Sequence, residues 1–520
     1  MVTKVNTIGL FGLNAFPVTA EINAYKGVPD FQIVGLADVS VQESKQRIFS
    51  AMANTGIALE NKTIVINLTP ASVKKTGASY DLAIFAAMIA AQGEESNIKA
   101  DLEKSAFFGE ISLCGDVMPV NGALSMAIEA RNNGITHLFV PHDNAAEASV
   151  VKGLKVHEVR HIGNLYRYLL GHGDLAVHKP YTPEAAAYVG LDDFADVKGQ
   201  ENIKIAMTIA AAGFHNLLMV GTPGTGKSML AKRLPSILPQ MSFDESIETT
   251  QVYSVAGMVD KNAPLIVNRP FRAVSHTASA AGLVGGSGTP RPGEISLAHN
   301  GVLFLDELPE FDRRVLETLR QPVENREIII SRALGSVRYP CNFMLVAAMN
   351  PCPCGNFGHP TKSCICSPAA VTRYLGKVSQ PVLDRIDIQV EVNPLTYDEI
   401  SAKNQDKPEN RICSAQMRED VERVREIQKR RFVAMGVEEV CTSNSEIPAK
   451  LLDEVCVLAP AAKELIKGLF DKLGMSARAY DRILKVARTA ADVDGCELIE
   501  RKHLSQAISY RSLDRKYWNR

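Results

Sequence analysis

The sequence predicts an α/β protein of about three domains that ends in a helical region. Residues 1–170 alternate short β-like runs with helical runs, which is typical of an α/β domain. Residues 191–395 contain a strand, a glycine-rich loop and a helix in succession, and further strands alternate with helices as in a parallel sheet. Residues 396–520 form consecutive helical stretches, and turn formers in residues 171–190 indicate a linker.

Composition favours an ordinary globular protein. Hydrophobic residues make up 46% of the chain and charged residues 22%. The formal net charge is −1, so any nucleic-acid surface has to be local. No apolar run approaches the ~18 residues of a membrane span, and the first fifteen residues lack the pattern of a secretory signal. We therefore expect a cytoplasmic protein without membrane contact, whose ten cysteines are kept reduced.

The first domain, residues 1–170, contains runs of both kinds. The β-like runs are Phe31–Val34, Thr63–Leu68 and His137–Pro141. The helical runs are Val41–Ala53 and Tyr80–Ala91. This alternation alone predicts the α/β class but assigns no chemistry.

A phosphate-binding loop organises the second domain. The apolar run Asn216–Val220 precedes it as a buried strand, and the helix former Met229–Leu234 follows it. The loop matches the pattern G-x-x-x-x-G-K-[ST] and consists of Gly221, Thr222, Pro223, Gly224, Thr225, Gly226, Lys227 and Ser228. Glycines let backbone N–H groups surround a phosphate, and the helix presents its positive end to the anion. We expect Lys227 to reach the β- and γ-phosphates of ATP and Ser228 to hold Mg²⁺.

Two carboxylates follow the next apolar strand. Gly301–Leu305 ends in Asp306 and Glu307, and a parallel sheet delivers such a pair to the edge where the phosphate loop lies. We expect Asp306 to complete the Mg²⁺ site and Glu307 to activate the attacking water. Solvated acid pairs are common after apolar runs, but the phosphate loop upstream favours catalysis.

Three further polar residues fit the same reaction. Asn350 ends the strand Phe343–Met349, where an amide senses the γ-phosphate; a turn-capping role is the alternative. Arg385 lies between Asp384 and Asp387 and is either part of a local ion pair or an arginine finger. Arg478 opens a C-terminal helix, from which we expect it to reach the nucleotide as part of a helical lid.

The C-terminal region consists of helices behind a polar loop, Lys403–Arg411. The expected helices are Gln416–Met435, Ala449–Leu458, Ala461–Leu473, Ala477–Val493 and Lys502–Tyr510.

Together these motifs resemble an AAA+ ATPase, and in detail the Mg-chelatase-like branch and its YifB/ComM family. The resemblance covers essentially the whole chain. It rests on Asp196–Gln200, the phosphate loop, Asp306-Glu307, Asn350, Leu383–Arg385, Ser476–Arg478 and the runs Ser296–Glu310 and Asn350–Gly355. It implies a hexameric ring in which Arg385 acts on a neighbouring subunit. It also implies a link to DNA through the branch-migration helicase of natural transformation.

The first domain resembles the proteolytic domain of Lon-type proteases, an S5-like α/β fold. The run Gly109–Gly122 matches that family's motif, and Ser79 falls where the family has its nucleophile. Met126 stands where the catalytic lysine belongs, and a serine without a base is a poor nucleophile. We expect a Lon-like domain without the Ser–Lys dyad; Lys74 or Lys75 as a substitute base is the alternative.

A cysteine cluster occupies the loop 352–366. Cys352, Cys354, Cys364 and Cys366 form C-x-C-x₉-C-x-C. Four thiolates this close suit a tetrahedral structural Zn²⁺, although the C-x-C spacing is tighter than the common C-x₂-C. The alternative is free thiols or a disulfide. We expect His359 to be a bystander.

A basic hairpin is predicted between Asp306 and Asn350. Six arginines and no lysine lie in this interval. Arg332 and Arg338 fall on the two arms of a hairpin, Glu327–Pro340, where they are able to grip DNA phosphates without reading sequence. The glycine-rich run Thr277–Thr289 has the composition of a second channel loop. Ordinary ion pairs with nearby glutamates are the alternative for each arginine.

The favoured function is an ATP-driven ring motor on single-stranded or branched DNA, a branch-migration helicase or translocase. ATP hydrolysis rests on the residues themselves, and the DNA partner rests largely on the resemblance. Three alternatives remain: a magnesium-chelatase ATPase subunit, a Lon-like ATP-dependent protease, which Met126 disfavours, and a nucleotide-gated scaffold.

Overall fold

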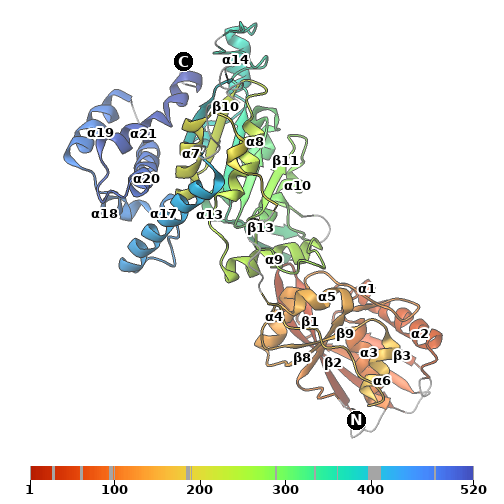
Figure 1. The fold of residues 1–520 in the computed structure, drawn as a ribbon. Coiled ribbons are helices and arrows are strands. Elements are labelled where there is room, and N and C mark those ends of the chain that lie inside the picture. The colour runs from red at the N-terminus through yellow and green to blue at the C-terminus, as the bar shows by residue number, and fades with distance from the viewer. Residues whose placement is uncertain are drawn as a thin grey trace.

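A five-stranded parallel sheet forms the centre of the molecule (Figure 1). The computed structural model describes residues 2–25, 30–58, 62–92, 98, 100–182, 188, 190–286, 290–332, 335–359, 361–395, 412–473 and 476–518. The strand order is β11 (Phe271–Val274), β12 (Val302–Leu305), β15 (Met344–Met349), β10 (Leu217–Gly221) and β16 (Ile388–Val392). All neighbouring pairs are parallel, so their carboxyl ends meet at one edge of the sheet.

Both faces of this sheet are covered, which explains why its strands are continuous apolar runs. Alternate residues of β10 divide between two cores. Met219 packs with α7 (Glu201–Gly213) and with α17 (Ser414–Ala434) and α20 (Ala477–Val493) on one face. Leu218 packs with α12 (Arg313–Thr318) and with the hairpin of β13 (Glu327–Arg332) and β14 (Gly335–Pro340) on the other.

A seven-stranded mixed sheet forms the N-terminal lobe. Its order is β3 (Asp30–Val34), β4 (Thr63–Thr69), β2 (Asn14–Tyr25), β1 (Val2–Phe11), β5 (Ser105–Phe107), β8 (His137–Pro141) and β9 (Lys155–Val159). The first expected helix is divided into α1 (Val39–Gln42) and α2 (Ser44–Asn54). The second, α3 (Asp81–Gln92), packs on the sheet with ten buried residues, which explains its apolar composition. The α/β class predicted from the alternation is confirmed.

The C-terminal region is helical, and α17, α19 (Pro460–Leu473), α20 and α21 (Arg501–Ser509) lie close to their expected positions. The expected helix Ala449–Leu458 is different: a 3₁₀ turn, Ala449–Leu451, leads into the four-residue α18 (Leu452–Val455). It ends early because Leu458 pairs as an extended bridge with Ile499. The predicted loop Lys403–Arg411 lies outside the described residues.

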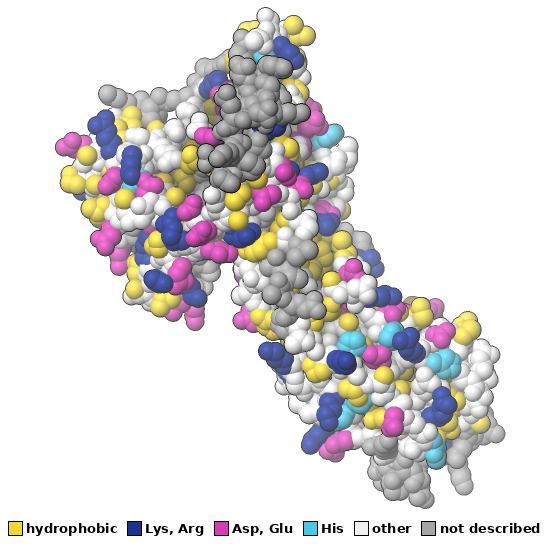
Figure 2. Space-filling view, in the orientation of Figure 1, with side chains coloured by type: hydrophobic (Ala, Val, Ile, Leu, Met, Phe, Trp, Pro, Cys, Tyr) yellow, Lys and Arg dark blue, Asp and Glu magenta, His cyan; other side chains and the backbone are white. Residues whose placement is uncertain are grey.

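The N-terminal lobe joins the central sheet region through α4 (Ala123–Asn132) and α9 (Phe243–Ala256), as Figure 1 shows. The Gly122 amide donates to the Ser254 carbonyl at 3.0 Å, and Lys261 Nζ lies 2.5 Å from Asp143 Oδ2. On the face shown in Figure 2, basic and acidic side chains are interspersed, in keeping with the near-zero net charge. None of the described helices is both long and apolar enough to cross a membrane.

Candidate functional site: a nucleotide site at one sheet edge

The phosphate loop lies at the carboxyl edge of the parallel sheet, between β10 and α8 (Lys227–Arg233). Every residue of β10 is buried, which fixes the start of the loop. Gly224 and Gly226 have φ values of +80° and +87°, a left-handed conformation in which glycine carries no Cβ penalty. The turn is therefore able to bring backbone N–H groups to a phosphate.

Lys227 is folded back onto its own loop. Its Nζ donates to the carbonyls of Gly221 at 2.8 Å and Thr222 at 3.0 Å, and to Asn350 Oδ1 at 3.2 Å. Burial lowers the pKa of Lys227, while the nearby Asp306 and Glu307 carboxylates act in the opposite direction. All three acceptors are neutral oxygens. A phosphate would offer Lys227 a charged acceptor in their place, and charge-assisted hydrogen bonds are stronger.

Ser228 and Asp306 meet directly. The Ser228 hydroxyl donates to Asp306 Oδ2 at 2.6 Å, although the two residues lie on different elements, α8 and the end of β12. Hydroxyl and carboxylate oxygens are ligands that Mg²⁺ accepts. The pair therefore fits a magnesium ion that also contacts the phosphates of a nucleotide.

Glu307 follows with a left-handed backbone, φ +53°, and an exposed side chain. His276 Nδ1 lies 3.2 Å from Glu307 Oε2. We did not predict this partner, although a signal existed: β11 and β12 are parallel neighbours, so residues just beyond both strands meet at the same edge. The pairing links the Glu307 carboxylate to the segment that follows β11.

Arg385 and Arg478 lie at the opposite edge of the sheet. The Arg385 carbonyl accepts from Asn216, which immediately precedes β10, at 2.8 Å. Arg478 lines a pocket of about 500 Å³ together with Asn216 and Asp387. Five residues at about 3.3 Å each separate the two edges by about 16 Å. Arg478 therefore lies away from the phosphate loop of its own chain, and its approach to a nucleotide from a helical lid stays a prediction.

The Arg385 side chain is held in place within its own chain. Its Nη2 forms an ion pair with Glu324 Oε1 at 2.5 Å. Its Nε and Nη1 donate to the carbonyls of Arg320 and Pro381. Arg385 thus forms a local ion pair, with Glu324 in place of the flanking Asp384 and Asp387, and the arginine finger stays a prediction.

The four cysteines of the loop 352–366 form one cluster. Sγ–Sγ distances are 3.4 Å for Cys352–Cys354, 3.7 Å for Cys352–Cys364 and 3.6 Å for Cys354–Cys364, and Cys366 lies within 4.8 Å. A tetrahedral Zn²⁺ with Zn–S bonds of about 2.3 Å places its sulfurs about 3.8 Å apart. The donor set and its spacing therefore fit zinc. His359 is outside the cluster, and its Nδ1 accepts from the amides of Thr361 and Lys362.

This cysteine loop is connected to the phosphate loop and to the C-terminal tail. Gly355 packs against Pro223, the third residue of the phosphate loop. Phe357 packs edge-on against Tyr517, whose hydroxyl donates to Glu391 at 3.0 Å. Glu391 lies on β16 opposite Val220 of β10. The cysteine cluster therefore lies beside the carboxyl edge of the sheet, next to the phosphate loop.

The predicted hairpin is present as β13 and β14, apart from residues 333 and 334, which lie outside the described residues. Arg332 is exposed and bonds only to the adjacent Ser331 carbonyl among its described contacts. Arg338 is exposed and pairs with Glu327 at 3.0 Å. Residues 287–289 of the predicted glycine-rich loop also lie outside the described residues.

Ser79 and Met126 occupy different environments. Ser79 precedes α3, whereas Met126 lies on the buried face of α4. Lys75 Nζ donates to the Pro70 carbonyl. Lys75 is thus engaged by the backbone, and a Lon-like domain without the Ser–Lys dyad stays a prediction.

Comparisons with known proteins agree with these features. Three family models match: "Magnesium chelatase, subunit ChlI" over residues 193–400, "Subunit ChlI of Mg-chelatase" over 20–144, and "Magnesium chelatase, subunit ChlI C-terminal" over 411–511. The chain is 41% identical to competence protein ComM of Haemophilus influenzae, across 97% of this chain and 96% of that one. It is 40% identical to the uncharacterized protein YifB of Escherichia coli, across 98% and 97%. The magnesium-chelatase 38 kDa subunit of Rhodobacter capsulatus is 26% identical across 30% of this chain and 50% of its own.

Proposed function

Because the chain belongs to the YifB/ComM family of Mg-chelatase-like AAA+ proteins, we propose that it is an ATP-driven ring motor that moves branched DNA. One observation supports the assembly of subunits into a ring. Lys227, Ser228–Asp306 and Asn350 lie at one edge of the sheet, while Arg385 and Arg478 lie at the other. A complete hydrolytic site then needs residues from two neighbouring subunits, and a ring brings such neighbours together.

Within one subunit, the phosphate loop binds the ATP phosphates. Lys227 exchanges its carbonyl partners for the β- and γ-phosphates, and Ser228 and Asp306 hold Mg²⁺. When bound, such an ion would supply positive charge to the phosphates. Glu307 accepts a proton from the attacking water, and Asn350 positions that water from the tip of the adjacent strand β15.

Between subunits, the amino edge supplies positive charge. Arg385 reaches the γ-phosphate bound by its neighbour once Glu324 releases it, and Arg478 contacts the same nucleotide from α20. Such a finger stabilises the transition state of phosphoryl transfer. The arrangement supports a homo-oligomer, for which we propose a hexameric ring.

DNA is the proposed partner of the β13–β14 hairpin. Exposed Arg332 and Arg338 bind phosphates, and the hairpin follows β12 and precedes β15, the strands that end in Asp306 and Asn350. The hairpin also packs against the N-terminal lobe, because Gly335 lies over Phe11. A shift of either strand end on hydrolysis is thereby passed to the DNA.

A structural Zn²⁺ in the cysteine cluster completes the proposal. Cys352, Cys354, Cys364 and Cys366 hold the ion, which fixes a loop that begins two residues after Asn350. Purified protein should contain one zinc per chain, and Cys364→Ser should lose it while Cys413→Ser, outside the cluster, retains it.

A second function, that of an ATPase subunit driving metal insertion, is favoured by the match to the magnesium-chelatase 38 kDa subunit. A DNA unwinding assay distinguishes these two functions. A labelled forked duplex should be unwound with ATP and Mg²⁺, but not with a non-hydrolysable analogue or by Glu307→Gln. Robust ATP turnover without unwinding or movement of a fork would reject the motor on DNA.

A further inference from the structure

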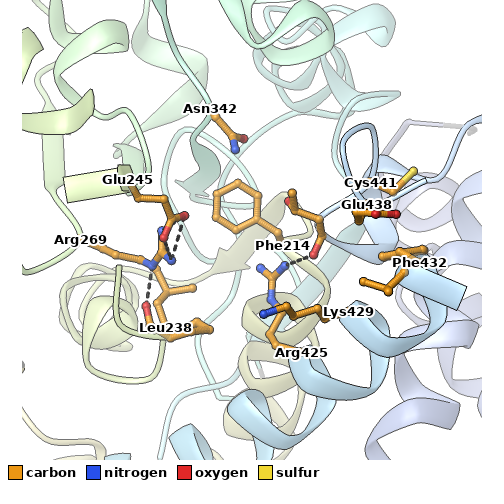
Figure 3. A pocket seen from close by; sticks show the side chains of 13 residues that line it. Phe214, Leu238, Glu245, Arg269, Asn342, Arg425, Lys429, Phe432, Glu438 and Cys441 are labelled. Carbon is orange, nitrogen blue, oxygen red and sulfur yellow. Dashed lines mark hydrogen bonds and ion pairs between the residues drawn. The ribbon is translucent and has the colours of Figure 1, made fainter. Parts of the chain in front are cut away.

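A cavity of about 340 Å³ lies at the amino edge of the sheet, away from the nucleotide site (Figure 3). Its walls come from segments far apart in sequence. Phe214 ends α7, Leu238 and Arg269 flank α9, and Arg425 and Phe432 belong to α17. This volume is in the range of sites for small organic molecules.

The walls combine apolar and aromatic surface with a few polar groups. Phe214 is nearly buried and has a left-handed backbone, φ +56°, which is uncommon for a bulky residue. Its ring lies in the centre of the view in Figure 3, and the Arg425 guanidinium lies 5.5 Å from the ring centroid. Strained backbone of this kind persists where the surrounding structure holds it, often at ligand sites.

Arg425 forms no ion pair with a described carboxylate, although Glu446 and Glu245 favour its charged form from a greater distance. Its Nη1 and Nη2 donate only to the carbonyls of Thr442 at 3.2 Å and Ala211 at 3.3 Å, and its Nε has no partner among the described residues. Burial, with Arg269 nearby, lowers the pKa of Arg425 to about 10. A desolvated cation without an anion is costly, so the site favours an incoming anion.

Of the other two cations that line the cavity, Lys429 is exposed and Arg269 is already neutralised. Arg269 pairs with Glu245 at 3.1 Å and donates to the carbonyls of Pro239 and Asn300. Asn342 Oδ1, in the wall above Phe214 in Figure 3, is buried without a partner among the described residues. Besides Lys429 and Glu438, the cavity therefore offers a guanidinium outside any ion pair, an acceptor without a described partner and aromatic surface.

We propose that this cavity binds a small organic anion with a planar apolar body, whose carboxylate or phosphate pairs with Arg425 while its body lies against Phe214 and Phe432. The site is separate from the nucleotide edge and does not depend on the proposed motor function. Phe214 precedes β10 by three residues, and β10 ends at the phosphate loop, so the cavity lies at the far end of the strand that carries this loop.

The test uses two probes of the same shape, 2-naphthoate and its uncharged amide, titrated into the full-length protein by calorimetry. Naphthoate should bind at least about tenfold more tightly than naphthamide, since a hydrogen bond to a charged group is worth more than a neutral one. Arg425→Gln should abolish that difference while keeping an N–H donor for the carbonyls. Val433→Trp should weaken both probes by filling the cavity.

Arg423→Gln is the matched control, because Arg423 lies on the same helix and pairs with Asp420 on the exposed surface. It should bind both probes as the unmodified protein does, and circular dichroism checks that every variant is folded. Failure of naphthoate to bind, equal binding of the amide, or unchanged preference in Arg425→Gln would overturn the proposal. So would a Val433→Trp variant that changes only oligomeric size, since the cavity would then accept a neighbouring subunit.

Discussion

Gly355 of the cysteine loop lies directly against Pro223 of the phosphate loop. A Cβ atom at Gly355 would be 2.4 Å from Pro223 Cδ and 2.6 Å from Cγ, closer than packed atoms approach. The two loops are separated by more than a hundred residues of sequence, yet they approach so closely that a side chain at position 355 would clash. The cysteine cluster is therefore a support for the nucleotide site as well as a metal site.

Gly355→Ala should raise the KM for ATP more than it lowers the amount of bound zinc, because the new methyl group displaces Pro223. Gly358→Ala is the control: both glycines have φ +78°, but only Lys516 Nζ, at 3.9 Å, lies near the Gly358 position. The difference between the variants thus isolates the clash from backbone strain. Equal KM values for ATP in the two variants would show that the contact does not position the phosphate loop.

Asp387→Asn should destabilise the joint between the sheet and the C-terminal helices. Arg482 Nη1 lies 2.5 Å from Asp387 Oδ1, and removing one partner of a buried pair costs about 3–5 kcal/mol. Burial opposes ionisation of Asp387, yet Arg482 and His215 together hold the pKa of this carboxyl well below its ordinary value.

The sign of the pH dependence follows from that lowered pKa. The stabilisation is fully present above the unfolded pKa of about 3.9 and is lost as pH falls toward the folded value. Urea unfolding should give a constant difference between Asp387→Asn and the unmodified protein from pH 7 to about pH 5, and a smaller one in stronger acid. A difference that grows on acidification would contradict this assignment.

Mixing two inactive variants should restore ATP turnover if Arg385 acts between subunits. Lys227→Ala removes the phosphate contact, and Arg385→Ala should lower turnover about a thousandfold by removing the finger. In a mixed ring, a Lys227→Ala subunit supplies its intact Arg385 to the intact phosphate loop of an Arg385→Ala neighbour. Turnover that stays at the level of the separate variants, in rings shown by light scattering to be mixed, would place the action of Arg385 within its own chain.

Arg332→Ala should weaken binding to all DNA sequences alike. It should also reduce the slope of log affinity against log salt concentration by about one. Its side chain is free of carboxylate partners among the described residues, so DNA replaces no internal ion pair. Arg314→Ala, an exposed arginine of α12 outside the hairpin, is the control. An equal loss of slope in both variants would assign the effect to general surface charge.

Local motifs explain how much of the site was predictable. The phosphate loop, Asp306–Glu307 and Asn350 each follow an apolar strand, and a parallel sheet brings such ends together whatever the connections between them. The Ser228–Asp306 contact and the neighbourhood of Lys227 and Asn350 follow from that rule. The spacing of the cysteines likewise predicted a cluster, because its members are close in sequence.

Features that depend on how distant segments pack were not predictable. The sequence position of Arg478 does not reveal that α20 lies at the amino edge of the sheet, away from the phosphate loop of the same chain. The pairing of Phe214 with Arg425 joins residues far apart in sequence, and neither belongs to a motif. The antiparallel pairing of β1 with β2 and the early end of α18 also reflect tertiary contacts.

ATP hydrolysis measured with and without forked DNA tests the central claim most directly. The purified protein should hydrolyse ATP, DNA should raise the rate severalfold, and Glu307→Gln should abolish both rates while ATP binding remains. Arg332→Ala should lower the stimulation more than the basal rate. Turnover that is robust but indifferent to single-stranded and forked DNA would leave an ATPase and contradict a motor on DNA.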